Sequence, residues 1–77
     1  MDVKEYLEIV LDIFQLEEDD IELNSGWRDN LISSIEITEL IAVLEQKIGG
    51  ERFSKDAVNE VILRNGTMMD ILKAAHG

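Results

Sequence analysis

Residues 33–48 place the strongest constraint on the fold, because both ends and the apolar face of a helix are marked there. Apolar residues recur at the spacing of one helical face over several turns. They are Ile37, Leu40, Ile41, Leu44 and Ile48. Ser33 and Glu36 have the spacing of a capping box at the start, and Gly49-Gly50 can end the helix. We therefore predict a helix over 33–48 that buries one side in a core.

An earlier helix is predicted over residues 2–14, where Asp2 can act as the cap and Glu5 follows three residues later. Its inward stripe is predicted to comprise Val3, Tyr6, Leu7, Val10, Leu11 and Phe14. Residues 16–32 then form a long connection, whose apolar residues we expect to fold back over the helices. They are Ile21, Leu23, Trp27, Leu31 and Ile32. Trp27 is expected to cover the core rather than to bind a ligand.

Two shorter helices are predicted in the last third of the chain. Ser54 begins the first of them and Asn65-Gly66 ends it. Its inner face is predicted to hold Ala57, Val58, Val61 and Ile62. Thr67 and Asp70 then repeat the capping pattern at the start of the last helix. Its inner face is predicted to hold Met68, Ile71, Leu72 and Ala75.

The size of the chain leaves room for one domain, residues 1–77, with a modest core. No cysteine is present to form a disulfide or a thiolate metal site. The periodic apolar residues argue against disorder. Agreement between capping patterns and apolar periods predicts an all-α fold: a four-helix bundle with a long first loop and a short third helix.

The charge is one-sided, with 17 acidic residues against 7 lysines and arginines and a net charge of −10. Nucleic acid and anionic membranes attract basic patches, so neither is an expected partner, whereas basic protein surfaces are. Alternatively, the acidic residues only keep the protein soluble and bind no partner. No apolar run is long enough for a membrane span, and the acidic N-terminal stretch differs from a signal peptide. We expect a cytoplasmic monomer whose apolar stripes are used internally.

Composition excludes most catalytic sites. His76 is the single histidine, and without cysteine neither a Ser-His triad nor a zinc site can be assembled. His76 is expected to be a solvated tail residue. Residues 19–26 lack the ligand pattern of a calcium loop, and no glycine-rich phosphate loop is present. A small bundle has no room for an ordinary substrate cleft, so we expect neither an enzyme nor a metal site.

Two adjacent serines remain at the start of the helix over 33–48. Capping alone is a sufficient reason for Ser33-Ser34, since serine is a favoured cap. Ser34, however, lies in the first turn, where free N–H groups and the positive end of the helix dipole favour an anion. The residues therefore leave two interpretations open: simple capping, or a phosphate-linked group carried by Ser34.

Residues 33–45 resemble, without a gap, the core motif of acyl carrier proteins. Their sequence is Ser-Ser-Ile-Glu-Ile-Thr-Glu-Leu-Ile-Ala-Val-Leu-Glu. That motif is commonly Asp-Ser-Leu followed by an acidic amphipathic helix. The resemblance implies that Ser34 receives 4′-phosphopantetheine from coenzyme A. It implies docking of partner enzymes on acidic positions, which here are Glu36, Glu39 and Glu45. It also suggests an acyl pocket lined by Ile37, Leu40, Ile41, Val61, Ile62 and Ile71.

The resemblance further implies a non-catalytic carrier that holds acyl groups as thioesters for fatty acid, polyketide or related synthesis. Its partners would be a phosphopantetheinyl transferase and acyl-loading and acyl-transferring enzymes with basic docking surfaces. Ser33 stands where the family usually has aspartate, which favours a specialised member over a housekeeping one. An unmodified, carrier-like acidic module that binds a basic protein is the alternative. A third possibility is an acidic helical protein of other ancestry that mimics nucleic-acid charge.

Overall fold

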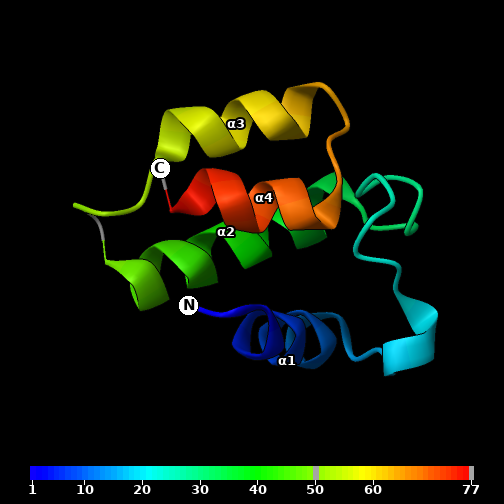
Figure 1. Cartoon of the computed structure of the whole chain (residues 1–77). Helices are drawn as coiled ribbons and strands as arrows, with labels where there is room; N and C mark the ends of the chain where they lie inside the picture. The colour runs from blue at the N-terminus through cyan, green and yellow to red at the C-terminus, as the bar shows by residue number, and fades with distance from the viewer. Residues whose placement is uncertain (50, 77) are drawn as a thin grey trace.

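Four α-helices run through the part of the chain that the computed structural model describes, residues 1–49 and 51–76. They are α1 (Val3–Phe14), α2 (Ser34–Ile48), α3 (Lys55–Leu63) and α4 (Met68–Ala75), with one turn of 3-10 helix, η1 (Glu18–Asp20), after α1. α1 packs on α2, α2 on α4, and α4 on α3 (Figure 1). The predicted all-α bundle with a long first loop and a short third helix is confirmed.

Side-chain caps define the starts of three helices, as the sequence predicts. The Asp2 carboxylate accepts a hydrogen bond of 2.8 Å from the Glu5 N–H at the start of α1. Ser33 and Thr67 form reciprocal capping boxes at the starts of α2 and α4. Ser54 precedes α3 but makes no side-chain capping bond. α2 ends at Gly49, which has a left-handed φ of 96°; Gly50 lies outside the described residues.

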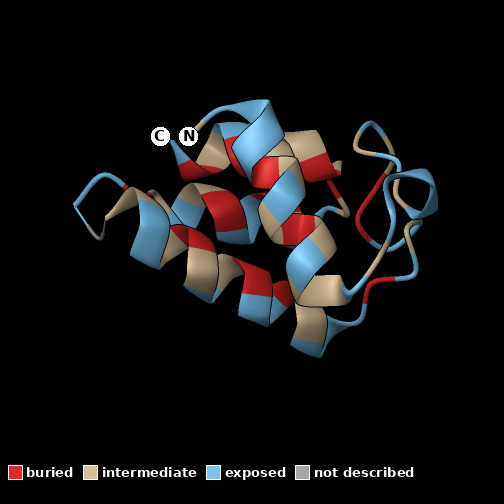
Figure 2. Cartoon of the chain, turned by 90° about the horizontal axis from the view of Figure 1, so that it is seen from below, coloured by how far each residue is buried: buried red, intermediate tan, exposed pale blue. Residues whose placement is uncertain are grey.

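The core lies where the inner faces of the helices meet (Figure 2). All four residues predicted for the inner face of α4 are buried, and so are Val58 and Val61 of α3. In α2 the predicted stripe is buried at Ile37, Leu40 and Leu44, and its other two members are partly buried against the core. The apolar period therefore identifies the buried faces of these three helices correctly.

The predicted inward stripe of α1 is partly wrong. Tyr6 and Val10 are fully buried, but Val3 is exposed. Ile9 and Ile13, which the prediction omits, pack against the core. The apolar residues of α1 cover a broad arc, roughly 200° at 100° per residue, so the helical period identifies this face but not which part of it is buried. Tertiary contacts make that choice, and the contact of Tyr6 with α4 is one of them.

The first loop covers one end of the core, as expected for most of its apolar residues. Trp27 is buried, and its Nε1–H donates a hydrogen bond of 3.0 Å to the Ile62 carbonyl of α3. Ile32 is buried, and Ile21 and Leu23 are partly buried against the core. Leu31 contradicts the prediction, because it is 91% exposed. The backbone of Leu31 is left-handed, with φ of 62°, and the next residue, Ile32, enters the core instead.

Backbone hydrogen bonds attach this loop to the start of α4. The Trp27 N–H donates to the Gly66 carbonyl at 3.1 Å, and the Met68 N–H donates to the Ser25 carbonyl at 3.2 Å. Gly66 has to be glycine here, because a Cβ would collide with the side chain of Val61. These bonds fix the loop that leads directly into the start of α2.

Tyr6 links α1 to the start of α4. Its hydroxyl donates a hydrogen bond of 2.7 Å to the Met68 carbonyl inside the core. We expect Tyr6→Phe to lower the free energy of unfolding by about 1–2 kcal/mol, because the carbonyl loses this donor. Urea denaturation of the two proteins measures the difference. An unchanged free energy would show that the bond contributes nothing net to stability.

Burial of Tyr6 also predicts unfolding in alkali. Desolvation raises the pKa of Tyr6 above its ordinary value of 10.0. The folded state then keeps a proton that the unfolded chain releases, so stability is complete below pH 10.0 and declines as the pH rises toward the raised pKa. Tyr6 is the only tyrosine, so tyrosinate absorbance should rise only as helical circular dichroism is lost. Tyrosinate formation at the ordinary pKa in a helical protein would contradict this.

Candidate functional site

The two serines at the start of α2 have different environments. Ser33 is the N-cap: its Oγ accepts from the Glu36 N–H at 3.2 Å, and its own N–H donates to Glu36 Oε1 at 3.0 Å. Ser34 is the first residue of the helix and is exposed. Among the side-chain hydrogen bonds of the described residues, none involves the Ser34 hydroxyl. Capping therefore occupies Ser33 and leaves the Ser34 hydroxyl accessible for chemistry.

The helix end beside Ser34 is electrostatically suited to an anion. In the described chain, the N–H groups of Ser34 and Ile35 take no part in the backbone hydrogen bonds, whereas the Ile37 N–H is satisfied by the Ser33 carbonyl. Unpaired N–H groups at the first turn carry the positive end of the helix dipole. A phosphate ester on the Ser34 hydroxyl would meet this positive end directly, despite the acidity of the chain.

A shallow apolar hollow of about 450 Å³ adjoins Ser34 on the outer side of α2. It is lined by Ser34, Ile35, Thr38, Glu39 and Ala42. Ile35 is 80% exposed, which is unusual for so large an apolar side chain. The Thr38 hydroxyl donates to the Ser34 carbonyl at 2.8 Å, so its polar group is used within the helix. In the sequence this hollow is indicated only by Ile35 and Ala42, which lie outside the predicted buried stripe of the helix.

The three glutamates assigned to partner docking lie on different sides of α2. Glu36 and Glu45 are separated by nine residues, about two and a half helical turns, and so point in opposite directions. Both border the buried stripe and are half-buried, and the Glu36 carboxylate also accepts the Ser33 N–H. Glu39 is exposed on the outer side and borders the hollow beside Ser34. Of the three, Glu39 has the carboxylate best placed for a partner that approaches Ser34.

The six residues suggested as an acyl pocket belong to the core. Ile37, Leu40, Val61 and Ile71 are buried, and Ile41 and Ile62 are partly buried against them. These side chains come from α2, α3 and α4, and both α2 and α3 pack on α4. An acyl chain could enter among them only if the packed side chains moved apart, since closely packed interiors leave little free volume.

A metal site and a membrane-spanning helix were also sought in residues 1–49 and 51–76. No group of three or more acidic, histidine or cysteine side chains there could hold a metal ion. None of the helices in these ranges combines the length and apolar character needed to cross a membrane. His76 is exposed, as expected, and its Nε2 lies 3.2 Å from the Met1 carbonyl oxygen at the other end of the bundle. It is therefore remote from Ser34.

Comparison with protein-family models, with curated proteins and with solved structures found no match for this chain.

The capping role of Ser33 gives a prediction about stability. Ser33→Ala removes the acceptor for the Glu36 N–H and should lower the free energy of unfolding by about 1 kcal/mol. Ser34→Ala removes an exposed hydroxyl that makes no such bond and should change it by less than about 0.5 kcal/mol. Urea denaturation of both variants tests the difference. Equal losses would contradict the division of roles between the two serines.

Proposed function

We propose that this chain is an acyl carrier protein that carries 4′-phosphopantetheine on Ser34 and presents acyl intermediates to partner enzymes of fatty acid, polyketide or related synthesis. The observation that carries the proposal is the exposed Ser34 hydroxyl at the positive end of α2, beside a serine that already performs the capping. The match of residues 33–45 to the carrier motif agrees with this position. The chain would act as a carrier and not as a catalyst.

The residues around Ser34 fit a phosphodiester. The Ser34 oxygen would form the ester bond to phosphorus as the pyrophosphate bond of coenzyme A breaks, with adenosine 3′,5′-bisphosphate leaving and the hydroxyl proton passing to a base of the transferase. The N–H groups of Ser34 and Ile35 would face the negative charge of the resulting phosphodiester. The thiol at the far end of the bound group would hold the acyl chain as a thioester. Because Ser33 and Glu36 cap the helix independently of Ser34, attachment would leave the fold unchanged. The core residues of α2, α3 and α4 would shelter an apolar chain if they part.

The direct test is to incubate the purified protein with a phosphopantetheinyl transferase and coenzyme A and to measure its intact mass. We expect the mass to increase by one phosphopantetheine group. Several transferases should be tried, including any encoded beside this gene, because Ser33 replaces the aspartate typical of the family. An unchanged mass with all of them would count heavily against the proposal.

The proposed docking surface gives a prediction for Glu39. Glu39→Lys places a cation beside Ser34, where a basic transferase would approach, and should raise the transferase KM for the carrier about tenfold at low salt. Glu60→Lys changes the net charge equally at an exposed position on α3 and should alter KM less than about twofold. Steady-state modification rates measure both values. Equal effects would place docking elsewhere.

An unmodified interaction module is the second candidate. The exposed Ile35 and the apolar hollow beside it favour a protein contact at this face, whether or not Ser34 is modified. On this alternative a basic partner would bind Ser34→Ala as tightly as the original protein, and Glu39→Lys would still prevent binding. Discovery of the phosphopantetheine group on protein isolated from its own cells would exclude it.

A further inference from the structure

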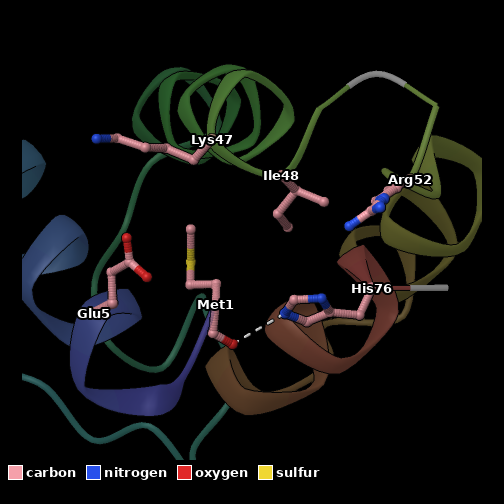
Figure 3. A pocket seen from close by; sticks show the side chains of 6 residues that line it. All are labelled: Met1, Glu5, Lys47, Ile48, Arg52 and His76. Carbon is pink, nitrogen blue, oxygen red and sulfur yellow. Dashed lines mark hydrogen bonds between the residues drawn. The ribbon is translucent and has the colours of Figure 1, made fainter.

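A second hollow of about 460 Å³ lies at the end of the bundle where Met1 and His76 come together (Figure 3). It is lined by Met1, Glu5, Lys47, Ile48, Arg52 and His76. Ile48 is the last residue of α2 and Ser34 the first, so the two hollows are separated by the length of a 15-residue helix, about 20 Å. This hollow is therefore distinct from the proposed carrier site.

The hollow gathers positive groups in a chain whose net charge is −10. Figure 3 shows Arg52 and His76 on the same side, with Glu5 across the hollow from them and Met1 and Ile48 between. Lys47 extends away from the centre in the same view. One wall thus offers a guanidinium and an imidazole, the opposite wall a carboxylate, and the floor is apolar.

Two of the basic groups have a structural explanation. Lys47 lies in the last turn of α2, and His76 is the C-cap of α4, where basic side chains stabilise the negative ends of helix dipoles. Arg52 has no such role, because it lies in the connection between α2 and α3. Its backbone N–H donates to the Gly49 carbonyl at 3.0 Å, which holds the turn, while its side chain points into the hollow (Figure 3).

The His76 ring is held in a defined orientation beside Arg52. Its Nε2 lies 3.2 Å from the Met1 carbonyl oxygen. A carbonyl can only accept, so Nε2 carries the hydrogen of this bond. When the ring is protonated, Nδ1 provides a second N–H donor, and the ring adds a positive charge to that of Arg52.

We propose that this hollow binds a small oxyanion, the phosphate or carboxylate group of a small molecule, between Arg52 and His76. A guanidinium fork pairs with two oxygens of either group at once, which makes it a strong and directional ligand for them. The volume exceeds that of the anion alone, so an apolar body attached to it would lie on Met1 and Ile48. Glu5 on the far wall repels a second anionic group, so the ligand carries its negative charge at one end.

The test is a titration of the whole, unmodified chain with inorganic phosphate, acetate and butyrate, monitored by amide NMR chemical shifts. The ionic strength is held constant, and chloride serves as the reference anion. Saturable shifts around Glu5, Lys47, Arg52 and His76 with phosphate would support binding of phosphate groups. Saturable shifts with the carboxylates would support binding of carboxylates, and tighter binding of butyrate than of acetate would place the apolar body on the floor. If none of the three anions gives saturable shifts there, the proposal is overturned.

Matched variants locate the binding group. Arg52→Gln should weaken binding at least about tenfold, and Arg52→Lys, which keeps the charge but loses the fork, should weaken it less. Arg64→Gln removes the same charge from an exposed arginine just after α3 and should change the dissociation constant less than about twofold. Equal weakening by Arg52→Gln and Arg64→Gln would mean that overall charge is responsible and would overturn the site. Because Ser34 is unmodified throughout, the result is independent of the proposed carrier function.

Discussion

Ser34→Ala is expected to abolish phosphopantetheine transfer completely, whereas Ser33→Ala is expected to remain a substrate. The physical reason is that the acceptor oxygen must be accessible and outside the helix cap. The Ser34 hydroxyl meets both conditions, while Ser33 Oγ accepts the Glu36 N–H at 3.2 Å. Loss of the Ser33 hydroxyl weakens the cap by about 1 kcal/mol but leaves the helix and the acceptor in place.

Intact-mass spectrometry of both variants after incubation with transferase and coenzyme A measures this effect. Circular dichroism provides the control, because both variants should retain the helical spectrum of the original protein. Modification of Ser34→Ala would place the attachment on another residue, and the absence of modification in a folded Ser33→Ala would show that the Ser33 side chain is also required. Either result would contradict the division of roles proposed for the two serines.

Leu40→Ala should produce the largest loss of stability, about 3–4 kcal/mol, because it leaves a cavity in the centre of the core. Leu40 is 0% exposed and belongs to the stripe by which α2 faces the other helices. A domain of this size has a total stability of roughly 4–12 kcal/mol. The variant is therefore expected to lose at least about a quarter of the total stability.

Leu63→Ala is the matched control for this loss. It makes the same chemical change at a leucine that is 85% exposed at the end of α3 and should alter stability by less than about 0.5 kcal/mol. Fluorescence of Trp27, the only tryptophan and a buried one, reports unfolding in urea for both variants. Similar losses for the two variants would contradict the assignment of Leu40 to the core.

Local patterns predict much of this fold because they depend on neighbours in sequence. Asp2, Ser33 and Thr67 cap helices through groups three residues away, and all three caps are present in the structure. The buried face of α4 follows from the helical period without error. Trp27 covers the core as predicted, because so few aromatic residues are available to do so.

Features that depend on distant contacts are not visible in the sequence. The bridge between Gly26 and Thr67, which attaches the first loop to α4, joins residues far apart in the chain. Leu31 is exposed because of a left-handed backbone that its residue type does not indicate. The hollow containing Arg52 forms only when the ends of α1, α2 and α4 meet.

In the candidate site, too, the sequence predicts the local features but not the surroundings of each side chain. The motif places Ser34 at the start of a helix, and the structure confirms that α2 begins there. The motif does not show that Glu36 is engaged in the cap or that Glu45 lies on the opposite side of the helix from it. It also does not show the apolar hollow beside Ser34, since that surface is formed by residues outside the buried stripe.

Whether Ser34 carries phosphopantetheine is tested most directly by the mass of the protein isolated from its own cells, with fragmentation to locate any attached group. We expect a population that bears one phosphopantetheine group on Ser34. A protein that carries no such group under conditions of active growth, or carries it on another residue, would contradict it.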